Sequence, residues 1–388
     1  MTSKADTFAP LFEPLTVRGV TLPNRMAMAP MTRSFCPGGH PGPENVAYYS
    51  KRAQGEAGLI VTEAIGLDHP VAIGDTGLGE KDLPLFDGPE AVAAWRKVVD
   101  SVHAAGTPIF PQLWHQGVMR LPGSQPNPHL PAFSPSGHYG DPDKASEYYK
   151  EMARKLAIKG PVPTDAEIVE VIESFGRAAE QAVAAGFDGL ALHGAHGYLI
   201  DQFLWAETNL RTDRWGGNRK ERTRFAVEVV KRVRQAIGED RPLIFRFSQW
   251  KQQDFLTRLA DTPAELEEVL GPIADAGVDI FDASVRYFDT PAFKDSDMSL
   301  AGWAKKLTGK LTCAVGGIGF DKGMYETFDY KPTEGVNNLD KVMRRFERGE
   351  FDIVFIGRAL LNDPAWVAKA KRGEKFPPFD FKTLEQLL

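Results

Sequence analysis

The sequence predicts an α/β protein built as a single (β/α)8 TIM barrel over residues 1–388, with an N-terminal hairpin and insertions on the C-terminal face. Eight short β-type runs alternate with longer stretches whose apolar residues recur at helical spacing, which is the pattern of parallel βα units. No linker rich in Ser, Gly or Pro divides these units into separate domains. A barrel usually needs about 250 residues, so the excess length must lie in insertions.

The elements follow one another in a regular order along the chain. A hairpin is predicted first, over "LTVRGVTLPN" (15–24), where it would close the bottom of the barrel. The eight strands are predicted at 25–31, 58–64, 107–114, 187–193, 242–248, 279–284, 311–317 and 351–357. The clearest helices are predicted at 87–106, 164–186, 219–238, 262–277 and 337–350. Several of these helices begin after Thr, Asp or Asn and end at Gly, which are the usual cap residues.

Two insertions account for much of the extra length. The first spans about 118–163 and follows the third strand, and the second spans about 320–335 and follows the seventh. Both follow strands rather than helices. We therefore expect them on the face of the barrel where enzymes of this fold keep their active sites.

Composition limits the class of protein. A net charge of −6 and a pI near 5.8 argue against a nucleic-acid partner, which needs clustered Lys and Arg. The sequence has neither an apolar signal core nor an apolar run long enough to span a bilayer, so no membrane partner is expected. Its two cysteines, Cys36 and Cys313, cannot form a disulfide framework or a four-thiolate iron-sulfur cluster. We expect a cytoplasmic monomer or homodimer that acts on small molecules.

Polar and small residues gather where the predicted strands end. The stretch "HGAHGYLIDQF" (193–203) places two histidines and a tyrosine directly after the fourth strand. A single polar residue at a strand end is more often structural than functional, but the shared location favours a common site. The residues are Thr32, Gln112, Trp114, His193, His196, Tyr198, Arg246, Gly316, Gly317, Gly357 and Arg358.

The last two strands predict a phosphate site. "VGGIG" (315–319) and "IGRALL" (356–361) combine small residues, which let backbone N–H groups approach an anion, with Arg358. A phosphate site after strands seven and eight recurs in this fold. The sequence contains neither a Rossmann G-x-G-x-x-G after a strand nor a Walker motif. The phosphate of a flavin mononucleotide (FMN) is therefore a candidate ligand.

Arg246, in the apolar run "PLIFRFS" (242–248), has two interpretations. A buried guanidinium needs an anionic or acceptor partner. The partner is either the pyrimidine side of a reduced flavin, which Gln112 would also contact, or a barrel carboxylate such as Asp282 or Glu63. The residues alone leave both open.

The chain resembles the old yellow enzymes, which are FMN-dependent ene-reductases on (β/α)8 barrels. The resemblance runs from "LFEPLTVRGVTLPNRMAMAPMTR" (11–33) through "QLWHQG" (112–117), the 193–203 stretch and "RTDRWGGNRKERTRF" (211–225) to "VGGIG" and "IGRALLNDP" (356–364). It implies reduction of the C=C bond of α,β-unsaturated carbonyl or nitro compounds, with NADH or NADPH as hydride donor. Many relatives have Asn where this chain has His196, and many have Ser-Pro where "SQW" (248–250) continues the fifth strand.

The resemblance also implies residue roles. His193 and His196 would hold the substrate oxygen, Tyr198 would donate a proton, and Trp114 would shape the pocket. The residues implied to bind FMN without a covalent bond are Pro30, Met31, Thr32, Ala64, Gln112, Arg246, Gly316, Gly317, Gly357 and Arg358.

These roles have a chemical reason. Hydride addition to an activated C=C bond drives negative charge onto the activating oxygen, where two neutral imidazoles stabilise it. The main alternative is a metal-dependent hydrolase or lyase, in which His193 and His196 bind a divalent ion and Gly357 and Arg358 bind a phosphorylated substrate. A flavin-binding protein without enzymatic activity is a third interpretation.

Overall fold

Eight parallel strands close into a barrel in a computed structural model of the chain, which describes residues 8–77, 79–145, 150–323, 326–327 and 330–387. Around the barrel the order is β10-β3-β4-β5-β6-β7-β8-β9, and every neighbouring pair is parallel. The predicted fold class is confirmed. The strands are β3 (Met26–Met28), β4 (Leu59–Gly66), β5 (Ile109–Trp114), β6 (Leu190–His193), β7 (Leu243–Ser248), β8 (Ile280–Ser284), β9 (Leu311–Val315) and β10 (Ile353–Ile356).

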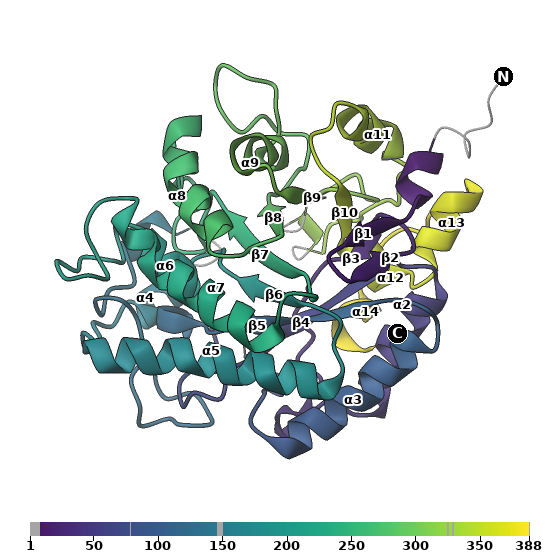
Figure 1. The fold of residues 1–388 in the computed structure, drawn as a ribbon. Coiled ribbons are helices and arrows are strands. Elements are labelled where there is room, and N and C mark those ends of the chain that lie inside the picture. Colours follow the sequence, from purple (N-terminus) through teal and green to yellow (C-terminus); the bar gives the residue numbers. More distant parts are fainter. Residues whose placement is uncertain (1–7, 78, 146–149, 324–325, 328–329, 388) are drawn as a thin grey trace.

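Helices surround the strands as an outer layer (Figure 1). One main helix follows each barrel strand: α2 (Pro43–Gln54), α3 (Pro89–His103), α5 (Asp165–Ala185), α7 (Arg224–Ile237), α8 (Pro263–Asp275), α9 (Leu300–Thr308), α11 (Leu339–Glu347) and α13 (Trp366–Arg372). Shorter helices are α4 (Lys150–Leu156), α6 (Leu199–Leu204), α12 (Arg358–Asn362) and α14 (Lys382–Glu385), with 3-10 turns at Ala9–Phe12, Pro37–Gly39, Gly117–Met119, Pro142–Lys144 and Glu221–Thr223. None of the helices in the described part of the chain has the length and apolar character that a bilayer crossing needs.

The predicted cap residues form hydrogen bonds at two helix starts. Thr164 and Glu167 make a reciprocal capping box at α5, and Thr262 and Glu265 make another at α8. The helix predicted at 219–238 begins later, at Arg224, because the residues before it form a 3-10 turn.

The N-terminal hairpin consists of β1 (Leu15–Val17) and β2 (Val20–Leu22) and closes one end of the barrel. Val17 and Leu22 belong to the same buried cluster as interior barrel residues such as Phe110. Arg18 fixes the hairpin through an ion pair of 2.6 Å to Asp279, which directly precedes β8. The hairpin therefore covers the end of the barrel at which the strands begin, as predicted.

The first strand is shorter than predicted. The sequence indicated 25–31, but β3 ends at Met28, and only the N–H of Ala29 still reaches a neighbour, the Ile356 carbonyl at 2.9 Å. Pro30 has no N–H to donate, so the ladder stops there. Residues 30–32 leave the sheet at the C-terminal end of the barrel.

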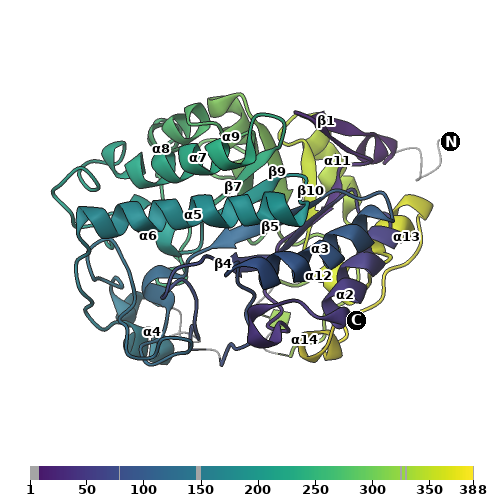
Figure 2. The same cartoon turned by 60° about the horizontal axis from the view of Figure 1, so that its bottom comes forward.

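The two predicted insertions lie after β5 and β9. Figure 2 shows α4, which belongs to the first, on the side of the barrel away from the hairpin. The second is closed by an isolated bridge between Phe320 and Gly335, and its residues 324–325 and 328–329 lie outside the described part of the chain. That residues 1–388 form one domain stays a prediction.

Candidate active site

Strand register places the predicted site residues side by side. His193, Arg246 and Asp282 are Cα partners across β6, β7 and β8. On the other side, Ala64 pairs with Gln112 across β4 and β5. Because all strands are parallel, these residues meet at the C-terminal end of the barrel, opposite the hairpin.

The two histidines, Tyr198 and Trp114 form one aromatic cluster. The ring centroid of His193 lies 5.0 Å from that of His196 and 4.9 Å from that of Tyr198. The Trp114 and Tyr198 centroids are also 4.9 Å apart, with the rings edge to face. The structure therefore brings together the four residues that were predicted to hold the substrate.

His193 is a neutral imidazole with a defined tautomer. Its Nδ1 accepts the backbone N–H of Ala195 at 3.4 Å, so the ring proton resides on Nε2. Burial, reinforced by the nearby Arg246 guanidinium, lowers the pKa of His193 well below its usual value. His193 can therefore donate a neutral hydrogen bond through Nε2.

His196 is held in an unusual backbone conformation. Its φ of 64° lies in the left-handed region, where Asn, Asp and His are enriched among non-glycine residues. Its Nε2 lies 2.7 Å from Ser284 Oγ, and its ring stacks on Trp250 at a centroid distance of 4.5 Å. Burial lowers the pKa of His196 well below its usual value, and the neighbouring His193 lowers it further. His196 is therefore also a neutral imidazole, fixed by two contacts that the sequence did not predict.

Arg246 forms the structural ion pair that was one of its two predicted interpretations. Its Nε lies 3.0 Å from Asp282 Oδ2, and both side chains are buried. Glu63 instead accepts the backbone N–H of Arg33 at 2.9 Å, so it is not the partner of Arg246. Burial raises the pKa of Asp282 to about 6, although Arg246 opposes the rise. The Nη1 of Arg246 reaches across to the Pro30 carbonyl at 3.5 Å.

The glycines after β9 make a tight turn. Gly316 and Gly317 have φ values of 113° and 68°, and a Cβ on Gly316 would lie 2.2 Å from the Val285 carbonyl oxygen. Asn338 braces this turn, since its Nδ2 donates to the Gly317 carbonyl at 2.6 Å and its Oδ1 accepts the N–H of Gly319 at 3.1 Å. Asn338 was not predicted as part of this site.

Arg358 lies next to Gly357 at the start of α12, but its hydrogen bonds run to the loop after β9. It donates to the carbonyls of Lys322 and Gly323 and to the hydroxyl of Thr327. Burial lowers the pKa of Arg358 to about 10, so it stays cationic at neutral pH. Arg358 thus ties the second insertion to the predicted phosphate site.

The residues at the barrel mouth fit a flavin. The Nε2 of Gln112 and the Oδ1 of Asp282 are buried and have no hydrogen-bond partner among the described residues. Buried polar atoms rarely remain unpaired. An amide donor and a guanidinium at the same end of the barrel match the polar edge of a flavin pyrimidine. Thr32 is exposed, and Met31, Gly316, Gly317 and Gly357 are partly exposed, so all are open to a ligand at this face.

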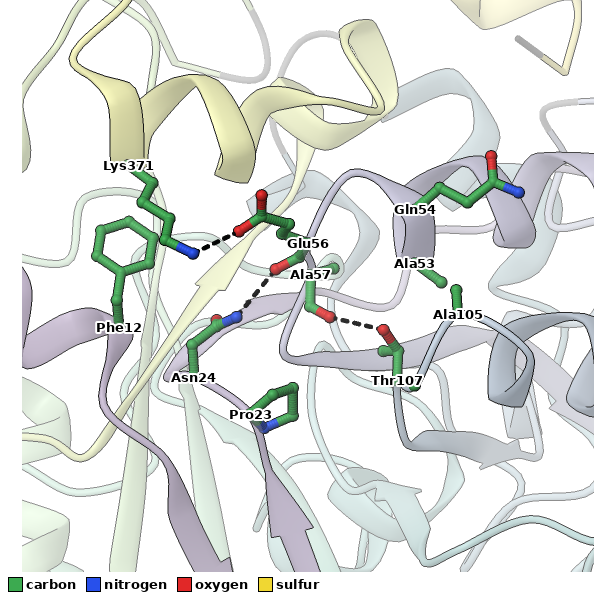
Figure 3. A pocket seen from close by; sticks show the side chains of 11 residues that line it. Phe12, Pro23, Asn24, Ala53, Gln54, Glu56, Ala57, Ala105, Thr107 and Lys371 are labelled. Atoms are coloured by element: carbon green, nitrogen blue, oxygen red, sulfur yellow. Dashed lines mark hydrogen bonds and ion pairs between the residues drawn. The ribbon is translucent and has the colours of Figure 1, made fainter.

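A hollow at the other end of the barrel is built differently (Figure 3). Its polar groups are paired with one another: Lys371 with Glu56 at 2.8 Å, and Asn24 with the Glu56 carbonyl at 2.9 Å. None of the predicted site residues lines it. Within the described ranges of the chain, no cluster of three His, Cys, Asp or Glu residues is arranged to hold a metal ion, so the hydrolase alternative gains no support.

Comparison with known proteins agrees with the fold. The NADH:flavin oxidoreductase / NADH oxidase family matches residues 10–376. The chain belongs to this family. This agrees with the resemblance to the old yellow enzymes, and the family name implies a flavin and a nicotinamide cofactor.

Individual relatives vary in how they align. A chanoclavine-I aldehyde reductase of Penicillium roqueforti is 32% identical over 96% of this chain and 92% of its own length. An NADH oxidase of Thermoanaerobacter brockii is 30% identical over 95% of this chain, which spans only 52% of that protein. The structure of morphinone reductase in complex with tetrahydroNAD superposes with a TM-score of 0.77 at 26% identity, covering 96% of this chain and 93% of the other.

Proposed function

We propose that the protein is an FMN-dependent ene-reductase that uses NADH or NADPH to reduce the activated C=C bond of α,β-unsaturated carbonyl or nitro compounds. This proposal rests on the cluster of two neutral histidines and Tyr198. The Arg246–Asp282 ion pair and Gln112 lie at the same end of the barrel. The relatives named as an aldehyde reductase and a morphinone reductase support a reductase activity.

The roles of the side chains follow from their charge and protonation. His193 Nε2–H donates to the carbonyl or nitro oxygen, and we assign His196, whose ring centroid lies 5.0 Å from that of His193, to the same oxygen. Neutral donors stabilise the negative charge that develops on this oxygen. They do so without the free-energy cost of keeping a cation buried before the reaction. Tyr198 delivers the proton to the α-carbon as a general acid. Trp114 packs edge to face against Tyr198 and limits the space above it.

The cofactor site is assigned to the other half of the barrel mouth. Gln112 and Arg246 would hold the pyrimidine edge of non-covalent FMN, with Pro30, Met31, Thr32 and Ala64 along the ring. Gly316, Gly317, Gly357 and Arg358 would hold its phosphate. Bound FMN supplies the hydride that it has received from the nicotinamide.

Two measurements test this proposal. Mass spectrometry of the ligand released by heat should identify FMN, and anaerobic mixing of the reduced protein with a panel of enones and nitroalkenes should reoxidise the flavin. Release of FAD or of a metal alone would contradict the cofactor. Reoxidation by oxygen but by no alkene would contradict the substrate class.

We expect Arg358→Ala to weaken FMN binding by about 10- to 150-fold, because it removes a charge-assisted contact worth about 1.5–3 kcal/mol. Fluorescence titration of the apoprotein with FMN measures the effect. Thr327→Val is the matched control, since it loosens the same loop contact while leaving the Arg358 charge in place. Equal losses in both variants would mean that Arg358 only anchors the loop.

The proposed setting is a reducing cytoplasm, in keeping with two buried free cysteines, Cys36 and Cys313. We propose a monomer or homodimer with a small-molecule substrate and no nucleic-acid or membrane partner.

A further inference from the structure

Four consecutive residues after β7, Trp250–Gln253, contact the loop that carries His196 and Tyr198. The Trp250 ring stacks on the His196 ring at 4.5 Å. The Gln253 Nε2 donates to the carbonyl of residue 197 at 2.9 Å. An isolated parallel bridge between residues 196 and 251 joins the two backbones. We call these residues the 250–253 segment. The segment packs against the loop that carries His196 and Tyr198, which we call the proposed catalytic loop.

Within it, Gln252 contacts the proton donor itself. The Nε2 of Gln252 donates to the Tyr198 hydroxyl oxygen at 2.9 Å, and Tyr198 as a residue is only 8% exposed. The backbone N–H of Gln252 donates to the His196 carbonyl at 3.2 Å. This bond fixes the backbone position from which the side-chain amide of Gln252 extends to Tyr198. A hydroxyl whose oxygen accepts such a bond directs its own proton away from the amide nitrogen.

We propose that Gln252 is a positioning residue for proton transfer: it orients the Tyr198 hydroxyl as a donor and stabilises the tyrosinate that forms when the proton leaves. This inference rests on the proposed function and names a residue that acts through Tyr198 rather than on the substrate.

The proton transfer balances within this arrangement. The O–H bond of Tyr198 breaks, the proton forms the new C–H bond at the α-carbon, and the electron pair stays on the phenol oxygen. NADH or NADPH supplies the hydride equivalent at the β-carbon through the flavin, and solvent later returns a proton to Tyr198. A hydrogen bond to a charged oxygen is roughly twice as strong as one to a neutral oxygen. The Gln252 contact therefore strengthens as the reaction proceeds and lowers the barrier rather than only binding the ground state.

A double-mutant cycle tests the coupling. Gln252→Leu should slow reoxidation of the reduced flavin by an enone about 10-fold and leave flavin reduction by NAD(P)H within about 2-fold. Gln252→Glu keeps the shape of the side chain but should slow the same step. A carboxylate accepts a hydrogen bond from the Tyr198 O–H, which turns this proton away from the substrate, and it repels the tyrosinate. In a Tyr198→Phe background both substitutions should lose their effect on enone turnover.

Gln249→Leu serves as the control for general damage to the loop. Gln249 closes the same loop by exchanging two hydrogen bonds of 3.0 Å with the backbone of Ala260 rather than with Tyr198. A loop that matters only structurally would make Gln249→Leu and Gln252→Leu behave alike, in both the parent and the Tyr198→Phe background. That result would overturn the proposal.

A second readout does not depend on alkene reduction. The ¹³Cζ signal of Tyr198, assigned by its loss in Tyr198→Phe, should titrate at a higher pH in Gln252→Leu than in the parent protein, because the tyrosinate loses a donor. An unchanged titration would overturn the role of Gln252. A shifted titration in a protein that reduces no alkene would contradict the proposed function while supporting the Gln252 contact.

Discussion

Tyr198→Phe should slow enone reduction by about 10²- to 10⁴-fold while flavin reduction by NAD(P)H stays nearly intact, because only the first of these needs a general acid. The Tyr198 ring lies against both His193 and Trp114, so a phenylalanine fills the same space and keeps the pocket shape. The loss is therefore chemical rather than steric. Stopped-flow absorbance at the flavin band measures each half-reaction separately.

A variant that lacks both histidines should behave differently from Tyr198→Phe. Replacing both His193 and His196 by Ala removes the oxygen contact, so the protein should bind enones and phenols weakly while keeping its flavin. A phenol titration, followed by a long-wavelength charge-transfer band, reports that loss. Tyr198→Phe should leave phenol binding largely in place. If Tyr198→Phe impaired flavin reduction as severely as enone turnover, the assignment of Tyr198 as the proton donor would be wrong.

The barrel could be predicted because its signals are local and repeated. Each strand is a short apolar run, and the apolar residues of each main helix recur at helical spacing. The eight units could therefore be counted from local patterns, without knowledge of any long-range contact. The end of β3 could not be placed in this way. Residues 30 and 31 remain apolar after the ladder stops, and apolar character does not distinguish a residue that faces a neighbouring strand from one that faces a ligand.

The strand-end residues of the site could be predicted for a geometric reason. Parallel strands present their C-terminal ends at one face, so His193 and Arg246 had to be neighbours once the strands were assigned in order. Asp282 followed as a candidate partner from the next strand. Residues in loops carry no such register. Nothing in the composition of 249–254 indicates that Trp250 turns onto His196 or that Gln252 reaches Tyr198, because the conformation of a loop depends on contacts distant in sequence.

Stability of the same loop depends on a buried ion pair that the sequence analysis did not identify. Lys251 Nζ lies 2.7 Å from Asp201 Oδ1, and neither side chain has any exposed surface. The other carboxylate oxygen of Asp201 accepts the N–H of Gly197 at 2.8 Å, between His196 and Tyr198. The pair thus connects the 250–253 segment, α6 and the proposed catalytic loop.

We expect Lys251→Met to lower the free energy of unfolding by about 3–5 kcal/mol at pH 8, because it leaves a buried carboxylate without its counter-ion. Urea unfolding at a fixed excess of FMN measures this loss. Lys371→Met is the matched control, since it breaks the half-exposed pair with Glu56 and should cost no more than about 1 kcal/mol. The double variant Asp201→Leu/Lys251→Met should recover most of the loss, since it removes both charges.

The pH dependence of Lys251→Met separates a charge effect from a packing effect. Burial already raises the pKa of Asp201 in the parent protein, and Lys251 opposes the rise, so removing Lys251 raises this pKa further. A carboxyl whose pKa is higher in the folded than in the unfolded state destabilises the fold increasingly as pH rises above the unfolded value. The variant should therefore lose less stability at pH 5, where a larger fraction of Asp201 is protonated, than at pH 8. An equal loss at both values would mean that the lysine acts through its packed methylene chain, and the charge of Asp201 would then have no part in holding the catalytic loop.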